Sequence, residues 1–174
     1  HHLRAAAAFA LDSARFEGQL DLVFIGAPAV YQDTAEEALS CLVPIKNIHC
    51  EGDSRTAFTA ALGGQPGIVI LAGTGSFARG VNKRGETLTL GGWGTLLGDE
   101  GSAYDIGVQA LRLAVRSSEG RAPKTALVDL LKERFRISRV RELTRIVYRD
   151  DFTREQIASL APLVTAAARS GDEP

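Results

Sequence analysis

The first 64 residues alternate between segments of helical periodicity and short apolar runs. Apolar positions recur every three or four residues in the predicted helices, whereas the predicted strands are short continuous apolar runs. In order, the predicted elements are a helix at 3–16, a strand at 20–25, a helix at 34–42, a strand at 45–50 and a helix at 54–62. This αβαβα order predicts a layered α/β domain.

The pattern changes after a turn-rich stretch at 63–67. The continuous apolar run 67–72 predicts a fully buried strand, and the alternating segments 77–82 and 86–90 predict a hairpin. Beyond a glycine-rich loop the chain is predicted to be helical at 102–117, 125–135, 139–148 and 153–169. We therefore expect a domain boundary between residues 64 and 65.

Composition excludes several classes of protein. With 45% hydrophobic residues, the chain has enough apolar material for a packed core. The 20 basic and 21 acidic residues balance, which does not suggest a nucleic-acid partner. No apolar run approaches the roughly 20 residues of a membrane span, and Asp12 interrupts the N-terminal apolar stretch before it could form a signal peptide.

The cysteine and histidine counts argue against a disulfide framework and against a zinc site. There are two cysteines, Cys41 and Cys50, and three histidines. A disulfide-rich module or a structural zinc site would need more ligands in so short a chain. We therefore expect a reducing compartment, the cytoplasm, and no metal-ligating residues.

The turn Gly73-Thr74-Gly75-Ser76 follows the predicted buried strand. Two glycines remove side chains, so that backbone N–H groups can approach an anion, and Thr74 and Ser76 add hydroxyl donors. The turn is not a Walker A loop, and a strand follows where a dinucleotide-binding fingerprint would begin a helix. The residues predict a phosphate-binding turn, with an ordinary tight β-turn as the alternative.

A second glycine-rich segment, 91–101, surrounds the single tryptophan, Trp93. An indole face suits packing against a sugar ring, and Asp99, just before the predicted helix at 102–117, is placed to accept hydrogen bonds from hydroxyl groups. The alternatives are that Trp93 fills the core and that Asp99 and Glu100 place favourable charge at a helix N-terminus.

Asp53 follows the second predicted strand, next to the predicted boundary. Active sites of α/β folds lie at the carboxyl ends of strands, so Asp53 is a candidate catalytic carboxylate. The alternative is an N-cap for the helix at 54–62. The arginine-rich stretch 132–154 is interpreted as a solvated helical face, because it has few aromatic residues to stack on nucleic-acid bases.

Two strings at this spacing carry a family resemblance. The segment 68–76 (IVILAGTGS) and the segment 91–104, which contains GGWG and LGDEGSAY, resemble the N-acetylglucosamine kinases and the wider BadF/BadG/BcrA/BcrD ATPase family of the actin/hexokinase fold. The resemblance implies two ribonuclease-H-like α/β domains around a cleft. Residues 1–64 would be the latter part of the first domain, and 65–174 the first part of the second, with a helical region.

The same resemblance implies roles for individual residues. Gly73, Thr74, Gly75 and Ser76 would hold the phosphates of ATP, with Mg²⁺ bridging them. Asp53 would be the general base that takes the proton of the sugar hydroxyl. The amino-sugar pocket would include Gly92, Trp93 and Asp99. The expected partner is therefore a small amino sugar, N-acetylglucosamine or glucosamine, phosphorylated on a primary hydroxyl, and a homodimer is left open.

The sequence departs from the family pattern in several places. Neither the family's Asp-Gly-Gly-Gly-Thr loop, which positions magnesium, nor its adenosine-binding loop occurs in these residues, so we expect a central piece of a kinase, inactive by itself. Gly52 stands where an asparagine usually precedes the base, and Phe77 follows the turn where some amino-sugar kinases have a polar residue.

Two alternatives belong to other functional classes. A dehydratase-activating ATPase would hold an iron–sulfur cluster on cysteines, but Cys41 and Cys50 are distant in sequence from the glycine-rich segments. A non-catalytic sugar-sensing homologue would need a helix-turn-helix, and none is visible in the pattern.

Overall fold

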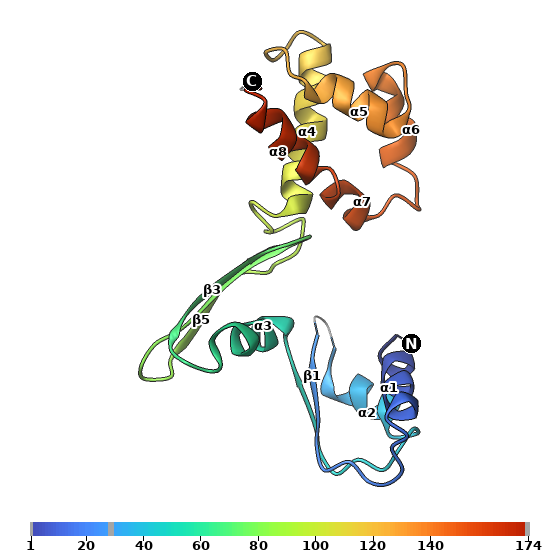
Figure 1. Ribbon diagram of the computed structural model, residues 1–174, viewed down its shortest axis with the longest axis vertical. Coiled ribbons are helices and arrows are strands. Elements are labelled where there is room, and N and C mark those ends of the chain that lie inside the picture. Colours follow the sequence, from blue (N-terminus) through green and yellow to red (C-terminus); the bar gives the residue numbers. More distant parts are fainter. Residues whose placement is uncertain (1, 28–29, 173–174) are drawn as a thin grey trace. The chain divides into compact units, whose positions relative to one another are not determined.

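The computed structural model describes residues 2–27 and 30–172 (Figure 1). They form two units. The first contains His1–Val69 and Arg79–Thr87, and the second contains Ile70–Ala78 and Leu88–Pro174. Across the described residues, no helix has both the length and the apolar character that crossing a bilayer requires.

The first unit is built on two parallel strands, β1 (Val23–Gly26) and β2 (Ile48–Glu51), which pair in the register Val23↔Ile48 to Gly26↔Glu51. The helices are α1 (His2–Ser13), α2 (Gln32–Leu39) and α3 (Asp53–Leu62). Ile25, Ala35 and Leu39 form the buried centre of this unit. The observed order is the predicted αβαβα.

Both strands of the first unit start later than predicted. Leu20 and Ile45, the first residues of the predicted strands, are paired by an isolated parallel bridge. Regular pairing begins only at Val23 and Ile48, because the backbone bends at Asp21 and at Lys46. The apolar pattern therefore located the pairing correctly but not the start of the continuous ladder.

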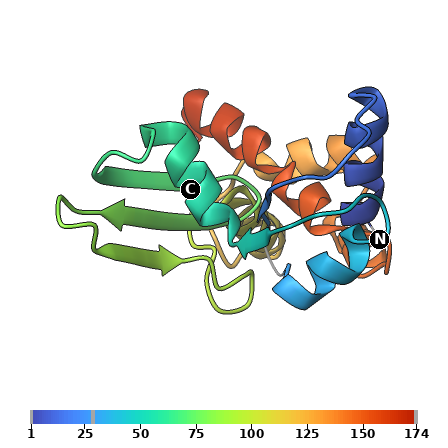
Figure 2. The ribbon, with the colours of Figure 1, turned by 90° about the horizontal axis from the view of Figure 1, so that it is seen from below.

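The middle of the chain forms a three-stranded sheet that contributes residues to both units. Its strands, β3 (Gly67–Ala72), β4 (Ser76–Val81) and β5 (Thr87–Gly91), lie in the order β3-β4-β5 (Figure 2). The predicted hairpin is confirmed. Its turn is held by the Asn82 side chain, whose Oδ1 accepts hydrogen bonds from the backbone N–H groups of Arg84 and Glu86, at 2.9 and 3.0 Å.

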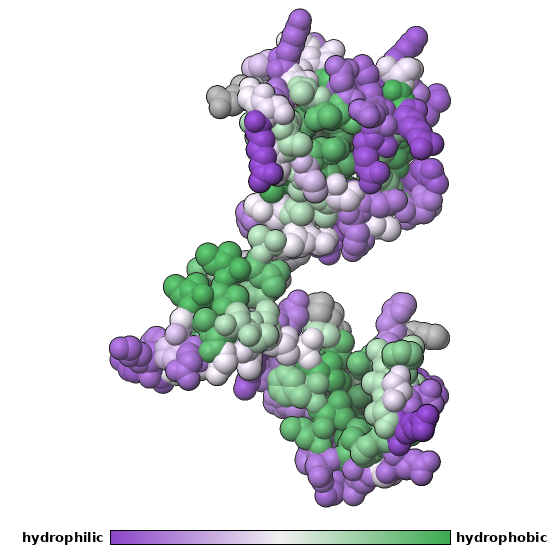
Figure 3. Space-filling model, viewed as in Figure 1, coloured by the Kyte–Doolittle hydropathy of each residue, from purple (hydrophilic) through white to green (hydrophobic). Residues whose placement is uncertain are grey.

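The prediction that β3 is fully buried is wrong for the described structure. Ile68 and Ile70 are 73% and 77% exposed, and Leu88 and Leu90 of β5 are similarly exposed. Figure 3 shows the resulting apolar surface over the strands. A continuous apolar run indicates a strand covered on both faces, but these side chains remain open to solvent among the described residues.

The helical part of the second unit is organised around α4 (Ala103–Ser118). It packs against α5 (Leu127–Phe135), α7 (Arg154–Ala158) and α8 (Ala161–Arg169). Small side chains on α4 let the neighbouring helices approach, and Ala110 and Ala114 are buried with Leu131 and Leu160. Ser102 caps α4, because its Oγ accepts the backbone N–H of Asp105 at 3.1 Å.

Two of the predicted helices are interrupted. The segment predicted as a helix at 139–148 consists of the 3-10 helix η1 (Val140–Leu143) and one turn of helix, α6 (Thr144–Val147). The segment predicted at 153–169 divides into α7 and α8. Pro162 lies in the first turn of α8, where backbone N–H groups have no partner within the helix, so the missing N–H of proline costs nothing. Inside a continuous helix the same proline would remove a backbone hydrogen bond.

Candidate functional site

The predicted phosphate-binding turn lies between β3 and β4. Within the turn, the Gly73 N–H donates to the Gly75 carbonyl oxygen at 2.9 Å. The Gly73 carbonyl oxygen accepts the N–H of Ala103, the first residue of α4, at 2.8 Å. The turn is thus fixed to the start of the central helix of the second unit.

Asp99 is turned inward onto this turn. Asp99 is 4% exposed, and its Oδ1 accepts a hydrogen bond from the backbone N–H of Ser76 at 3.1 Å. A Cβ added at Gly75 would lie 2.7 Å from the same Oδ1. The glycine at position 75 is therefore required by the protein's own carboxylate, in addition to any role it has in admitting an anion.

The loop around Asp99 closes on the turn through further hydrogen bonds. The Ser76 hydroxyl donates to the Glu100 carbonyl oxygen at 2.8 Å, and the Ser102 N–H donates to the Asp99 carbonyl oxygen at 3.1 Å. Asp99 adopts a left-handed backbone conformation with φ +64°, which is uncommon for a residue other than glycine. Several contacts therefore hold a locally unfavourable conformation in place.

These contacts define what the turn can offer a phosphate. The N–H groups of Gly73 and Ser76 are used within the protein. The N–H groups of Thr74 and Gly75 carry no hydrogen bond to the described residues, and the Thr74 hydroxyl is likewise unengaged. The turn thus keeps two amides and one hydroxyl for phosphate oxygens, a smaller donor set than the sequence predicted.

Trp93 lies in the loop that follows β5. It is 73% exposed, so the interpretation of Trp93 as core filling is wrong for the described structure. The preceding residue, Gly92, has φ +72°, and the loop is closed by a 2.8 Å hydrogen bond from the Gly98 N–H to the Gly94 carbonyl oxygen. The loop therefore presents its indole outward from the same unit that contains the turn Gly73–Ser76.

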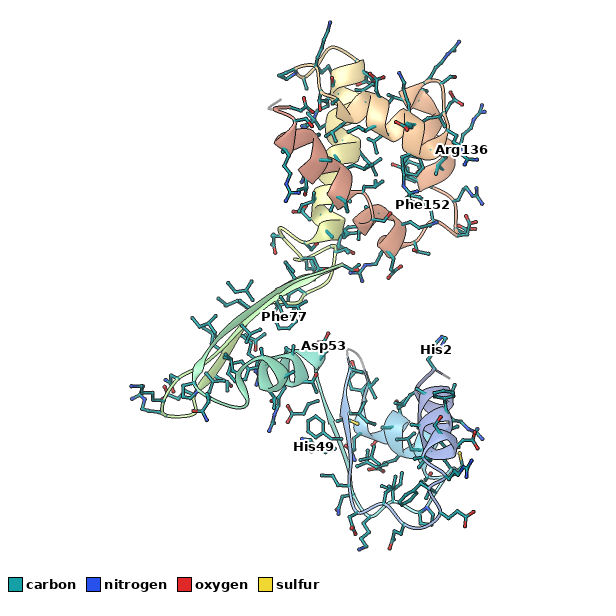
Figure 4. All side chains as sticks on the ribbon, in the orientation of Figure 1. His2, His49, Asp53, Phe77, Arg136 and Phe152 are labelled. Atoms are coloured by element: carbon teal, nitrogen blue, oxygen red, sulfur yellow. The ribbon has the colours of Figure 1, made fainter. Side chains whose placement is uncertain are left out.

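Asp53 is the first residue of α3 in the first unit (Figure 4). The cap of that helix is Gly52, so the interpretation of Asp53 as the N-cap is wrong. Its side chain is exposed and forms no hydrogen bond or ion pair with the described residues. A carboxylate without partners is free to act on a ligand. The structure brings the turn, Asp99 and the Trp93 loop into the second unit, whereas Asp53 belongs to the first.

The sequence did not indicate the contacts of two further charged residues. Glu51, two positions before Asp53, hydrogen-bonds to His49 Nε2 at 2.9 Å and pairs with Arg55. The hydrogen bond from His49, followed by the Arg55 charge, holds the pKa of Glu51 below its usual value. The i,i+4 spacing of Glu51 and Arg55 could have revealed this pair.

The other residue is Arg154, which lies in the stretch interpreted as a solvated face and forms an ion pair with Asp99. The two residues lie 55 positions apart. No local pattern signals this contact.

A magnesium ion would need carboxylate oxygens that are not already committed. In the described ranges, no group of three His, Cys, Asp or Glu side chains could hold a metal ion. Asp99 uses its oxygens on Ser76 and Arg154. A magnesium ion would therefore reach this turn with the phosphate oxygens that bind it, and not through a preformed cage of these residues.

Comparison with solved structures assigns the fold. A Chromobacterium violaceum protein, provisionally assigned as an N-acetylglucosamine kinase, matches with a TM-score of 0.75 and 26% identity, over 95% of this chain and 58% of that one. A Porphyromonas gingivalis structure matches with a TM-score of 0.66 at 23% identity, over 94% of this chain and 59% of that one. The chain is thus a mixed α/β protein with the fold of these structures.

The family follows from the sequence as a whole. The model of the BadF/BadG/BcrA/BcrD ATPase family matches residues 2–174, and the chain belongs to this family. It is 34% identical over 137 residues to the N-acetylmuramic acid/N-acetylglucosamine kinase of Clostridium acetobutylicum. It is 38% identical over 109 residues to the N-acetyl-D-glucosamine kinase of Dictyostelium discoideum.

These alignments cover only part of the related kinases. They include 79% and 62% of this chain, but 45% and 34% of the respective relatives. The chain therefore spans less than half the length of the curated relatives it matches.

Proposed function

We propose that this chain is part of an ATP-dependent kinase that transfers a phosphoryl group to the primary hydroxyl of an amino sugar. The substrate would be N-acetylglucosamine or a close relative such as glucosamine. The observation that carries the proposal is the turn Gly73–Ser76. Two backbone amides and a hydroxyl there have no hydrogen-bond partner among the described residues, and an outward-facing indole loop lies in the same unit. Relatives named as amino-sugar kinases support the choice of substrate class.

The phosphate turn would bind and orient ATP. The N–H groups of Thr74 and Gly75 and the Thr74 hydroxyl would donate to phosphate oxygens, while Gly73 and Ser76 keep the turn in shape through their internal hydrogen bonds. Enzymes that transfer phosphoryl groups act mainly by positioning and by stabilising charge, which is what such a turn supplies. Mg²⁺, when bound with ATP, would neutralise charge on the phosphates.

Asp53 would be the general base. Its carboxylate is exposed and forms no hydrogen bond or ion pair with the described residues, so it could accept the proton of the sugar hydroxyl as the phosphoryl group arrives. A carboxylate at the start of a helix that follows a strand is where α/β folds place such groups.

Gly92, Trp93 and Asp99 would belong to the sugar pocket. The indole is exposed and could pack against the apolar face of a sugar ring. Gly92 is exposed, and its N–H donates to the Ser76 carbonyl oxygen at 3.0 Å, which fixes the start of this loop to the turn. Asp99 is buried against Ser76, so it would also join the sugar loop to the phosphate turn. One residue would then affect both substrates.

The proposed architecture is a pair of ribonuclease-H-like domains. Residues 1–64 would be the latter part of the first, and 65–174 the first part of the second. The αβαβα order of residues 2–62 and the strand–turn–strand order of residues 67–81 support this division.

The test is a phosphorylation assay of the intact protein that carries this chain. ATP would be supplied with N-acetylglucosamine, glucosamine or N-acetylmuramic acid, and ADP release would be followed together with the phosphorus NMR spectrum of the product. We expect sugar-dependent ADP release and a phosphate ester at the primary hydroxyl. ATP hydrolysis that does not depend on sugar would instead favour a dehydratase-activating ATPase. Sugar binding without turnover would favour a sugar-sensing homologue.

A further inference from the structure

Arg154, at the start of α7, contacts a residue of the glycine-rich loop. Its Nη2 lies 3.2 Å from Oδ2 of Asp99, and its guanidinium carbon lies 5.8 Å from the centre of the Tyr104 ring. The Asp99 side chain is 5% exposed and that of Arg154 is 51% exposed. A largely buried carboxylate is thus paired with an arginine whose guanidinium also lies near an aromatic ring.

This pair differs from the Arg149–Asp151 ion pair of the same arginine-rich stretch. Arg149 and Asp151 are two residues apart, and their side chains are 61% and 68% exposed. Exposed pairs of this kind contribute little to stability. The Arg154–Asp99 pair joins two distant segments, and one partner is buried. It therefore does not fit the interpretation of this stretch as a solvated helical face.

The two oxygens of Asp99 have different partners. Oδ2 faces Arg154, and Oδ1 accepts the N–H of Ser76, the last residue of the phosphate turn. The bond to Ser76 also places Oδ1 in the space that a side chain at position 75 would occupy. An interaction that holds the Asp99 side chain in place therefore also holds the turn. Such an interaction is required, because the left-handed backbone conformation of Asp99 is unfavourable for a residue other than glycine.

We propose that Arg154 is a positioning residue for nucleotide binding, which acts through Asp99 to hold the turn Gly73–Ser76 in the shape that leaves its remaining amides open to phosphate. The proposal rests on the proposed kinase function for its ligand, but the mechanical link does not depend on it. Arg154 is not itself a phosphate ligand in this view, because its Nη2 is engaged with the carboxylate.

Removal of Arg154 has a defined physical consequence. A buried carboxylate that loses its cationic partner becomes costly, and the side chain relieves that cost by turning toward water. The Ser76 N–H would then lose its acceptor, and the turn would become more mobile. A lysine would keep the charge but lack the planar guanidinium, so it should restore the link only in part.

The experiment compares Arg154→Met and Arg154→Lys with the control Arg149→Met, which breaks the exposed pair in the same stretch. In the intact protein, amide hydrogen exchange of the peptide that covers residues 73–76 is measured beside peptides from α5 and α8. The KM values for ATP and for the sugar are measured as well. For Arg154→Met we expect faster exchange at 73–76, unchanged exchange in α5 and α8, and a KM for ATP raised about 10- to 100-fold.

The controls separate the link from a general loss of stability. Arg154→Lys should lie between wild type and Arg154→Met, and Arg149→Met should match wild type. Wild-type exchange at 73–76 in Arg154→Met overturns the proposal, as does an equal effect in Arg149→Met. Should Arg154→Met not fold, Arg154→Gln provides the same test, and wild-type exchange in that variant also overturns it.

Failure of the kinase proposal would be recognised separately. If the unchanged protein does not phosphorylate any of the three sugars, the exchange measurement still decides whether Arg154 fixes the turn. If exchange in Arg154→Met is faster only at residues 73–76, the link between Arg154 and the turn is supported without the kinase function. If exchange is faster to the same extent across the whole second unit, the link is overturned.

Discussion

The backbone carbonyl oxygen of Ile157 lies directly against Gly107, at the position that a Cβ on that residue would need. Gly107 is buried on α4, and Ile157 belongs to α7. The absence of a side chain at position 107 is therefore what allows these two helices to pack closely.

Gly107→Ala should destabilise the protein even though alanine favours helices. In an exposed helix this substitution would raise the free energy of unfolding by about 1 kcal/mol. Here the added methyl group meets backbone, which cannot move as a flexible side chain does, and overpacking of this kind costs about 1–3 kcal/mol. Urea denaturation should show a net loss of stability. Gln109→Ala, at an exposed position of the same helix, should show little change, and a stabilised Gly107→Ala variant would contradict the packing.

Trp93→Ala should weaken sugar binding more than ATP binding. The indole is exposed, so its removal should scarcely change the thermal midpoint. Loss of a ring-packing surface is worth about 1–3 kcal/mol, equivalent to roughly 5- to 150-fold in the KM for sugar. The matched control is Leu96→Ala in the same loop, because Leu96 is 92% exposed. Equal changes in both KM values would argue against a sugar-packing role.

Asp53→Asn should lower kcat while leaving stability and the sugar KM nearly unchanged. An amide cannot accept the hydroxyl proton, and removal of a general base typically lowers the rate by about 10²- to 10⁴-fold. Gly52 occupies the cap position, so the substitution removes no capping hydrogen bond. Asp33→Asn, at an exposed position in the first turn of α2, controls for loss of charge at a helix start. A folded Asp53→Asn variant with wild-type kcat would remove Asp53 from the mechanism.

Glu142 should make stability depend on pH. The Ser138 hydroxyl donates to its Oε1 at 2.9 Å, and the Arg139 and Ser138 N–H groups donate to the same atom. These bonds favour the charged form and hold the pKa of Glu142 below its usual value of 4.5. The stabilisation is therefore fully present above pH 4.5 and is lost as the pH falls through the lower pKa of the folded state.

Thermal unfolding of Glu142→Gln across a range of pH tests this linkage. The variant should be less stable than wild type at neutral pH, and the two should converge in acid. Glu133→Gln removes the same charge from α5, where the side chain forms no hydrogen bond with the described residues, and it should show no such convergence. A difference that stays constant into acid would exclude the proposed role of the charge.

The sequence predicted local order better than long-range contacts. The bounds of β3 agree with the predicted strand at 67–72, and the hairpin is present, because apolar patterning and turn residues act over a few positions. The helix predicted at 153–169 is interrupted before Pro162, where the apolar periodicity continues although the backbone hydrogen bonding does not.

The candidate site shows the same contrast between local structure, which the sequence predicted, and long-range contacts, which it did not. A phosphate-binding role for the turn Gly73–Ser76 was predicted from its own four residues and stays a prediction, while the structure places the turn between two strands. The inward orientation of Asp99 was not predicted, because its partner Arg154 lies 55 residues away, in a stretch whose composition resembles an ordinary charged surface. Contacts at such a separation depend on how α4 and α7 pack, which periodicity does not report.

The exposure of Trp93 gives the chain a built-in optical probe. It is the single tryptophan of the 174 residues, and it projects from the loop 91–101. Selective excitation of the indole in this chain would therefore report on that loop alone, free of contributions from the helical core. Water around the indole should give a red-shifted emission that iodide quenches readily. A molecule that covered the ring would shift the emission to shorter wavelength and shield it from the quencher.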